Sequence, residues 1–156
     1  MKQVLFILLS GSLLVACGPK ATDNEKLADK PTSMFSDEDR SISEGKGIGE
    51  VKEVTMNHPL DASRVKRGLD IYDMKCSACH QLDTVRLVGP GWQGLTKSRK
   101  PEWIMNMITN VDVMLEKDPE AQKLLQLCLT RMPNQNVSIG DARDILEFMR
   151  QNDGEE

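Results

Sequence analysis

The sequence predicts an all-α domain. Four segments repeat apolar residues at helical spacing, and no segment alternates convincingly as a strand would. Each segment begins with a helix start signal, at Asp61, Pro101, Asp118 and Ser138. The expected inner faces are Val65, Leu69 and Tyr72; Ile104, Met107, Ile108 and Val111; Ala121, Leu124, Leu125 and Cys128; and Ala142, Ile145, Leu146 and Met149.

The composition does not show what fills the interior of the domain. The chain has 156 residues, enough for one domain with appendages, yet only 4% are aromatic. A net charge of −4 argues against a nucleic-acid-binding protein. No apolar run reaches the roughly 20 residues that a membrane-spanning helix needs. Four cysteines would ordinarily suggest two disulfides.

The N-terminus has the layout of an export signal. Lys2 precedes two short apolar stretches that end at Cys17. The ending Leu14-Val15-Ala16-Cys17 resembles a bacterial lipobox, which implies a signal peptide over residues 1–16 and a lipid on Cys17. Gly18 then slightly favours anchoring at the inner face of the outer membrane over the outer face of the inner membrane. The alternatives are an ordinary signal peptide or a buried N-terminal strand.

Residues 17–55 are expected to be a flexible tether. Between residues 18 and 55 there are six basic and nine acidic residues, without helical or strand periodicity. The alternative is an extension that wraps around the domain. The folded domain is predicted to span residues 56–156.

The segment Cys76-Ser77-Ala78-Cys79-His80 is the attachment pattern of c-type haem. Cys76 and Cys79 would form thioethers with the haem vinyl groups, and His80 would bind the iron. A thioredoxin-like pair would need a βαβ context, and a structural zinc site would need a second ligand pair. The sequence offers neither.

From this motif onward, residues 64–151 resemble the class I monohaem cytochromes c. Gly68, Ile71 and Tyr72 match the first helix of that family, and Leu87-Val88-Gly89-Pro90-Gly91-Trp92 matches its loop after the haem motif. The resemblance implies about four helices packed around one covalent haem c. It also implies that the Pro90 carbonyl orients His80 and that Trp103 lies at the haem edge.

The sixth iron ligand is predicted to be Met132, because Met132-Pro133 resembles the axial Met-Pro of the same family. The chain has nine methionines, and Met114 is the first substitute. His58 could give a bis-histidine site but reads better as a surface residue. A copper site at Met56-Asn57-His58 or Met105-Asn106-Met107 is a weaker alternative. Cys128 is expected to be a small buried hydrophobe.

A haem with His and Met ligands has no open position, so the sequence predicts an electron carrier and not an enzyme. Expected partners are a membrane electron donor and a terminal reductase or oxidase. The segments 129–136 and 141–148 are similar to lipoprotein cytochromes associated with nitrous oxide reductase, which adds denitrification as a context. A haem-based redox or gas sensor with a displaceable Met132 is the alternative function. The protein is expected to be a periplasmic, membrane-anchored monomer.

Charge is distributed unevenly along the domain. Residues 64–100 hold five more basic than acidic residues, and residues 101–156 hold six more acidic than basic ones. Lys97, Arg99 and Lys100 cluster in a loop that would flank the haem. This predicts a basic haem side that steers acidic partners, or else an ordinary solvated loop.

Overall fold

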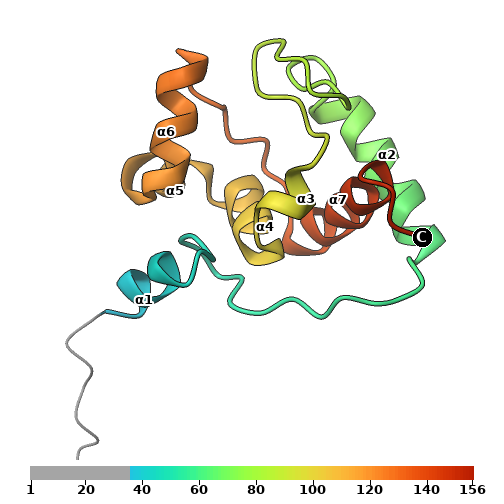
Figure 1. Ribbon diagram of the computed structural model, residues 1–156, viewed down its shortest axis with the longest axis horizontal. Coiled ribbons are helices and arrows are strands. Elements are labelled where there is room, and N and C mark those ends of the chain that lie inside the picture. The colour runs from blue at the N-terminus through green and yellow to red at the C-terminus, as the bar shows by residue number, and fades with distance from the viewer. Residues whose placement is uncertain (1–35) are drawn as a thin grey trace, which may run out of the picture. The chain divides into compact units, whose positions relative to one another are not determined.

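The computed structural model describes residues 36–156, and within this range the chain is helical without any strand. The all-α prediction is therefore confirmed. The predicted signal peptide and Cys17 lie outside the described residues. The helices are α1 (Asp37–Ser43), α2 (Ala62–Lys75), α3 (Leu95–Ser98), α4 (Pro101–Thr109), α5 (Val111–Lys117), α6 (Pro119–Cys128) and α7 (Ile139–Asn152) (Figure 1).

The four expected helix starts are all confirmed. The Asp61 carboxylate accepts hydrogen bonds from the amides of Ser63 and Arg64 at the start of α2. Asp118 caps α6 and Ser138 caps α7 in the same way. Pro101 occupies the first turn of α4, where its missing N–H costs no hydrogen bond.

Helices α2 and α7 make the closest helix contact in the fold. A Cβ at Gly68 would lie only 2.1 Å from the Asp144 carbonyl oxygen, so any side chain at this position would push the two helices apart. Asp144 also accepts hydrogen bonds from Arg64 and Arg67 across the contact. One α2 prediction is wrong: Leu69 is 38% exposed, because Gly68 rather than Leu69 faces α7.

The prediction of a flexible tether is wrong for residues 36–55, which pack on the domain. They form α1 and most of an extended strap, defined here as residues 46–57, that packs on α4 and α5. Ile48 and Val51 are buried, and the Ile48 amide donates to the Met114 sulfur at 3.0 Å. The Asn106 amide group bonds both the N–H and the C=O of Val51. Side chains of α4 and α5 thus replace the hydrogen bonds that the strap cannot make to itself, a compensation that composition does not reveal.

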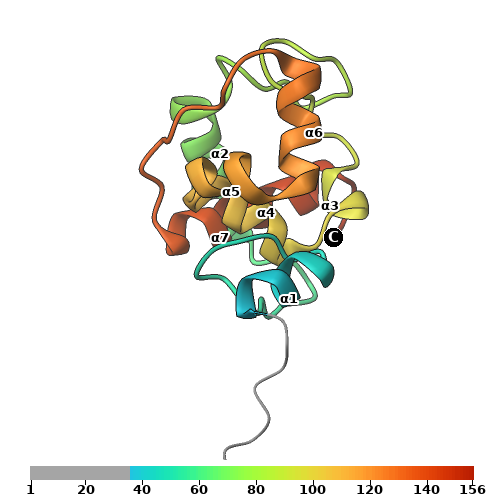
Figure 2. The same cartoon turned by 90° about the vertical axis from the view of Figure 1, so that its left-hand side faces the viewer.

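The helix expected from Pro101 through Val111 is interrupted. It divides at Asn110, whose backbone leaves the helical region at ψ 41°, and α5 begins at Val111. Asn110 donates a side-chain hydrogen bond to the Ile48 carbonyl of the strap. The break lets α5 and α6 follow a different direction from α4, and residues of all three helices line one cavity. Figure 2 shows the three helices from the side.

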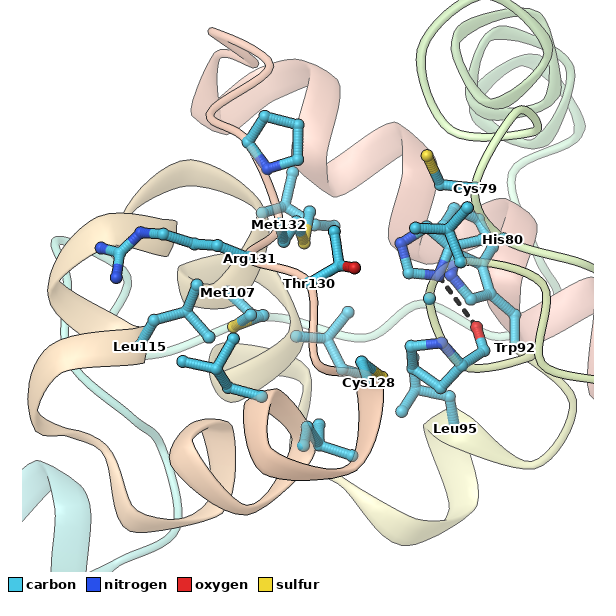
Figure 3. A pocket seen from close by; sticks show the side chains of 18 of the residues that line it. Cys79, His80, Trp92, Leu95, Met107, Leu115, Cys128, Thr130, Arg131 and Met132 are labelled. Atoms are coloured by element: carbon cyan, nitrogen blue, oxygen red, sulfur yellow. Dashed lines mark hydrogen bonds between the residues drawn. The ribbon is translucent and has the colours of Figure 1, made fainter.

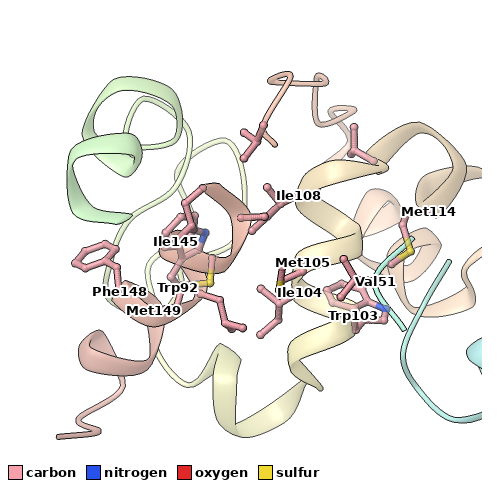
Figure 4. Close-up of a cluster of buried hydrophobic side chains, with 14 of the residues drawn as sticks. Val51, Trp92, Trp103, Ile104, Met105, Ile108, Met114, Ile145, Phe148 and Met149 are labelled. Carbon is pink, nitrogen blue, oxygen red and sulfur yellow. The ribbon is translucent and has the colours of Figure 1, made fainter. Parts of the chain in front are cut away.

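The buried core extends from the α2–α7 contact to the strap (Figure 4). Tyr72 packs against Trp92 and Phe148 with ring centroids 4.9 and 5.6 Å apart. At the end of the core that lies next to the strap, Trp103 and Met114 are buried. Within residues 36–156, no helix is long and apolar enough to cross a membrane.

Candidate haem site

The attachment motif begins where α2 ends. Cys76 is the C-cap residue of α2, and the amides of Cys79 and His80 both donate to its carbonyl oxygen. The Tyr72 hydroxyl donates to the His80 carbonyl at 2.7 Å. These bonds form a tight turn that places Cys76, Cys79 and His80 together.

The electrostatics of this turn differ from those of a reactive thiol pair. Burial raises the pKa of the Cys76 thiol to about 11, so the thiol stays protonated at neutral pH. Cys76, Cys79 and Cys128 are not disulfide-bonded. No cluster of three or more His, Cys, Asp or Glu side chains exists among residues 36–156 that could hold a metal ion. The described residues therefore support neither the thioredoxin-like nor the zinc alternative.

His80 is held by the loop that follows the motif. Its Nδ1 donates to the Pro90 carbonyl at 2.9 Å, and this bond leaves Nε2 as the free ring nitrogen. Gly89 lies against the ring, since a Cβ there would be 2.3 Å from His80 Cε1. Burial lowers the pKa of His80, while the bond to Pro90 opposes that change. A neutral imidazole is the form that binds iron.

A cavity of about 360 Å³ opens in front of His80. Its wall is almost entirely apolar and comes from the motif loop and from α3 through α7 (Figure 3). Figure 3 shows Met132 across the cavity from His80. The lining residues are Cys79, His80, Val88, Gly89, Pro90, Trp92, Leu95, Trp103, Ile104, Met107, Ile108, Leu115, Leu124, Leu125, Cys128, Thr130, Arg131, Met132, Pro133 and Met149.

The other candidate iron ligands differ in whether they line the cavity. Met114 is fully buried beneath the strap and does not line the cavity. His58 is also outside the lining, with a side chain that is 66% exposed and 3.3 Å from Glu155. Met107 does line the cavity. Within residues 36–156, His80 is therefore the cavity's histidine, and Met132 faces it.

Trp103 and Cys128 both line the cavity. The Trp103 indole donates to Asp118 at 3.1 Å, and the Arg99 guanidinium lies 4.9 Å from its ring centre. Arg99 also pairs with Glu120, so one cation of the predicted basic cluster is already engaged. Cys128 is half-buried in the wall rather than in the core.

Sequence reasoning missed several wall residues. Leu95 lines the cavity from a segment where Gly91 and Gly94 interrupt any periodicity, and Trp92 was matched to the family's loop without being assigned to the wall. Thr130 and Arg131 line the cavity from an irregular segment next to Met132. Their position next to Met132 in the sequence was the signal that could have identified them as wall residues.

An apolar cavity with an imidazole on one side, a thioether on the other and Cys79 of the attachment pair in its wall fits a covalently attached haem. The imidazole and thioether are ligands that iron accepts, and the cysteines are spaced for thioethers. The fold and site therefore define a haem c domain.

Comparisons with known proteins agree with the assignment of a haem c domain. The Cytochrome C1 family matches residues 52–124. A cytochrome c from Rhodothermus marinus is 35% identical, with a TM-score of 0.68 over 72% of this chain and 96% of its own. An engineered form of that cytochrome is 34% identical, with a TM-score of 0.67 and the same coverage. Another engineered form, bound to a carbene intermediate, is 33% identical, with a TM-score of 0.64. No curated protein matches the chain at a comparable level of significance.

This chain belongs to the cytochrome c family. It carries covalent haem c, transfers electrons with redox-protein partners, and is a carrier and not an enzyme.

Proposed function

We propose that this cytochrome is a lipid-anchored periplasmic carrier in which His80 and Met132 would bind the haem iron. The observation that carries the proposal is the pairing of these two side chains across an apolar cavity. Cys76 and Cys79 hold the haem covalently, Pro90 orients His80, and Trp103 packs at the haem edge.

The haem supplies an iron that accepts and donates one electron. The chain's own residues set the conditions for that exchange. The hydrogen bond that His80 Nδ1 donates to the Pro90 carbonyl fixes the tautomer and direction of the His80 ring. The Met132 thioether would bind the iron from the side opposite His80, would leave no position for a substrate and would raise the reduction potential. The apolar wall excludes water and further disfavours the more highly charged ferric state.

The lining also argues against substrate chemistry. No Asp, Glu or Lys of the described chain lines the cavity, so the wall lacks a carboxylate or amine for general acid–base catalysis. This supports electron transfer between proteins as the task of the site.

Cys17 is the proposed lipid attachment point, with residues 1–16 removed as signal peptide. A lipid at Cys17 would keep the carrier at the periplasmic side of a membrane, with the outer membrane slightly favoured. There it would pass electrons from a membrane donor to a terminal reductase. Nitrous oxide reductase is the proposed acceptor.

Stopped-flow spectroscopy tests this function. The reduced full-length holoprotein is mixed with terminal reductases and oxidases purified from the same organism, nitrous oxide reductase included. We expect single-exponential oxidation whose rate rises with acceptor concentration. Failure of every acceptor to oxidise the protein, together with a spectral shift of the reduced protein under carbon monoxide, would contradict the carrier function and favour the sensor.

A further inference from the structure

The C-terminal end of α7 is hydrogen-bonded to the loop that orients His80. We call residues 81–94 the ligand loop, which runs from the residue after His80 to the start of α3. The loop contains Pro90, whose carbonyl accepts the hydrogen bond from His80 Nδ1 (Figure 3). Because the ligand loop contains neither helix nor strand, its conformation depends on bonds across the loop and to neighbouring elements.

Asp153, the C-cap residue of α7, holds the end of the ligand loop. Its side chain is buried, and its carboxylate accepts hydrogen bonds from the Gly94 amide at 2.5 Å and from the Thr96 amide at 2.9 Å. The Thr96 hydroxyl donates a third bond at 2.5 Å. Gly94 is the N-cap of α3 and has no side chain, so Asp153 supplies from α7 the acceptor that the local sequence lacks.

Asn152, the last residue of α7, holds the start of the ligand loop. Its side-chain amide donates to the Leu82 carbonyl at 2.8 Å. The two ends of the loop are also joined to each other, since the Trp92 amide donates to the Gln81 carbonyl at 2.9 Å. Two successive residues of α7 therefore fix both ends of the loop that carries Pro90.

The end of α7 is itself fixed by Arg150. The Arg150 side chain is fully buried, and its guanidinium donates to Glu147 at 2.9 Å, to Glu155 at 2.7 Å and to the Asn57 carbonyl at 3.0 Å. Asn152 and Asp153 thus project from a rigid element, which is the support that precise orientation of a metal ligand requires.

We propose that Asn152 and Asp153 form a clamp that positions the Pro90 carbonyl against His80 and so adjusts electron donation from His80 to the iron. This inference rests on the proposed role of His80 as an iron ligand. A hydrogen bond from Nδ1 to a carbonyl makes an imidazole a stronger donor, which favours ferric iron and lowers the reduction potential. Both are positioning residues, since neither lines the haem cavity.

The start of the loop is tested by Asn152→Ala, which removes the bond to Leu82 without changing the charge. Gln151→Ala is the matched control, because Gln151 is the preceding residue of α7 and is exposed. Both substitutions place the best helix former in the last turn of α7, so their helix propensities match.

The end of the loop is tested by Asp153→Asn, which keeps the shape of the side chain but replaces one acceptor oxygen with an NH₂ donor. Asp144→Asn is the matched control. It removes the same charge from another buried carboxylate of α7, whose hydrogen bonds run to Arg64 and Arg67 of α2 and not to the ligand loop.

The first measurement is the exchange of the His80 Nδ1 proton with solvent, followed by NMR on the reduced, full-length holoprotein. We expect Asn152→Ala and Asp153→Asn each to speed this exchange about tenfold or more, because a loosened loop opens more often. Both controls are expected to exchange at the wild-type rate. The second measurement is redox titration, in which each clamp variant is expected to have a higher reduction potential than its control.

Urea denaturation of the four variants separates positioning from stability. Exchange rates that follow the free energy of unfolding across all four, or an unchanged potential in Asn152→Ala, would overturn the clamp and leave the carrier function intact. Effects in only one of the two clamp variants would also overturn it. A wild type whose His80 ring protons show no large paramagnetic shifts in the oxidised state would instead contradict His80 as an iron ligand, and with it the proposed function.

Discussion

The α2–α7 contact and the haem cavity differ in almost every property that governs stability. The contact is tight and charged: Gly68 lies against the α7 backbone, and Glu147 and Arg150 have fully buried side chains joined at 2.9 Å. The cavity is apolar, and its wall is built largely from short helices and irregular loops. The contact is packed by protein side chains alone, whereas the cavity wall would take its main packing partner from the haem.

The largest expected effect is on the buried ion network of α7. Arg150→Ala leaves Glu147 buried with one cation fewer and removes the hydrogen bond to the Asn57 carbonyl. We expect a loss of about 3–5 kcal/mol in the free energy of unfolding, measured by urea denaturation of the holoprotein.

The exposed pair of Lys123 and Glu120 supplies the control for this prediction. Lys123→Ala is expected to cost less than about 1 kcal/mol, since exposed pairs contribute little. Equal losses for the two variants would show that burial does not distinguish them.

Gly68→Ala tests the close approach of the two helices. The added methyl group would meet the Asp144 carbonyl and the Phe148 Cβ, so the helices must separate. We expect a loss of about 1–3 kcal/mol in thermal or urea unfolding. Gly140→Ala is the matched control, because its Cβ would meet only the Ser138 hydroxyl at 3.7 Å, and it should be neutral or stabilising.

Asp144 makes the contact sensitive to acid. Burial acts to raise the pKa of its carboxyl, but hydrogen bonds from Arg67 and Arg64 outweigh burial and hold that pKa below its usual value. A lowered folded-state pKa gives stability that is complete above the unfolded pKa of about 4 and is lost as pH falls through the folded pKa.

Asp144→Asn is therefore expected to cost about 1.5 kcal/mol at neutral pH and to flatten the decline in stability below about pH 4. Urea unfolding at a series of pH values measures both changes. An unchanged slope in the acid range would rule out Asp144 as a contributor.

On the cavity side, Gly89→Ala should cost less stability than Gly68→Ala but change the haem more. The added methyl group would displace the His80 ring, because the new Cβ would lie 2.3 Å from the ring's Cε1. We expect a shifted reduction potential and an altered visible spectrum, measured by redox titration. An unaltered potential with a large loss of stability would reverse the comparison between the two regions.

The sequence predicted those parts of the fold that local chemistry determines. Asp61, Asp118 and Ser138 cap their helices through neighbouring amides, so the starts could be read directly. The strap could not be predicted, because its hydrogen bonds run to Asn106 and Asn110, far away in the chain. Leu69 was misplaced because periodicity does not reveal that a glycine makes the closest contact.

The sequence predicted more of the attachment motif and its ligands than of the cavity wall. The attachment motif and the bond between His80 and Pro90 follow from short spacings and from a family resemblance, and the structure contains that bond. The sequence has nine methionines, of which the fold buries Met114 under the strap and places Met107, Met132 and Met149 in the cavity wall. Met132 lies opposite His80, and its role as the ligand stays a prediction.

The most direct test of the central claim is the weak sulfur-to-iron charge-transfer band near the red end of the visible spectrum of the oxidised holoprotein. We predict that Met132→Ala abolishes this band. Met107→Ala, which removes another methionine of the cavity wall, should retain it. Survival of the band in Met132→Ala, or its loss only in Met107→Ala, would contradict the assignment of Met132 as the ligand opposite His80.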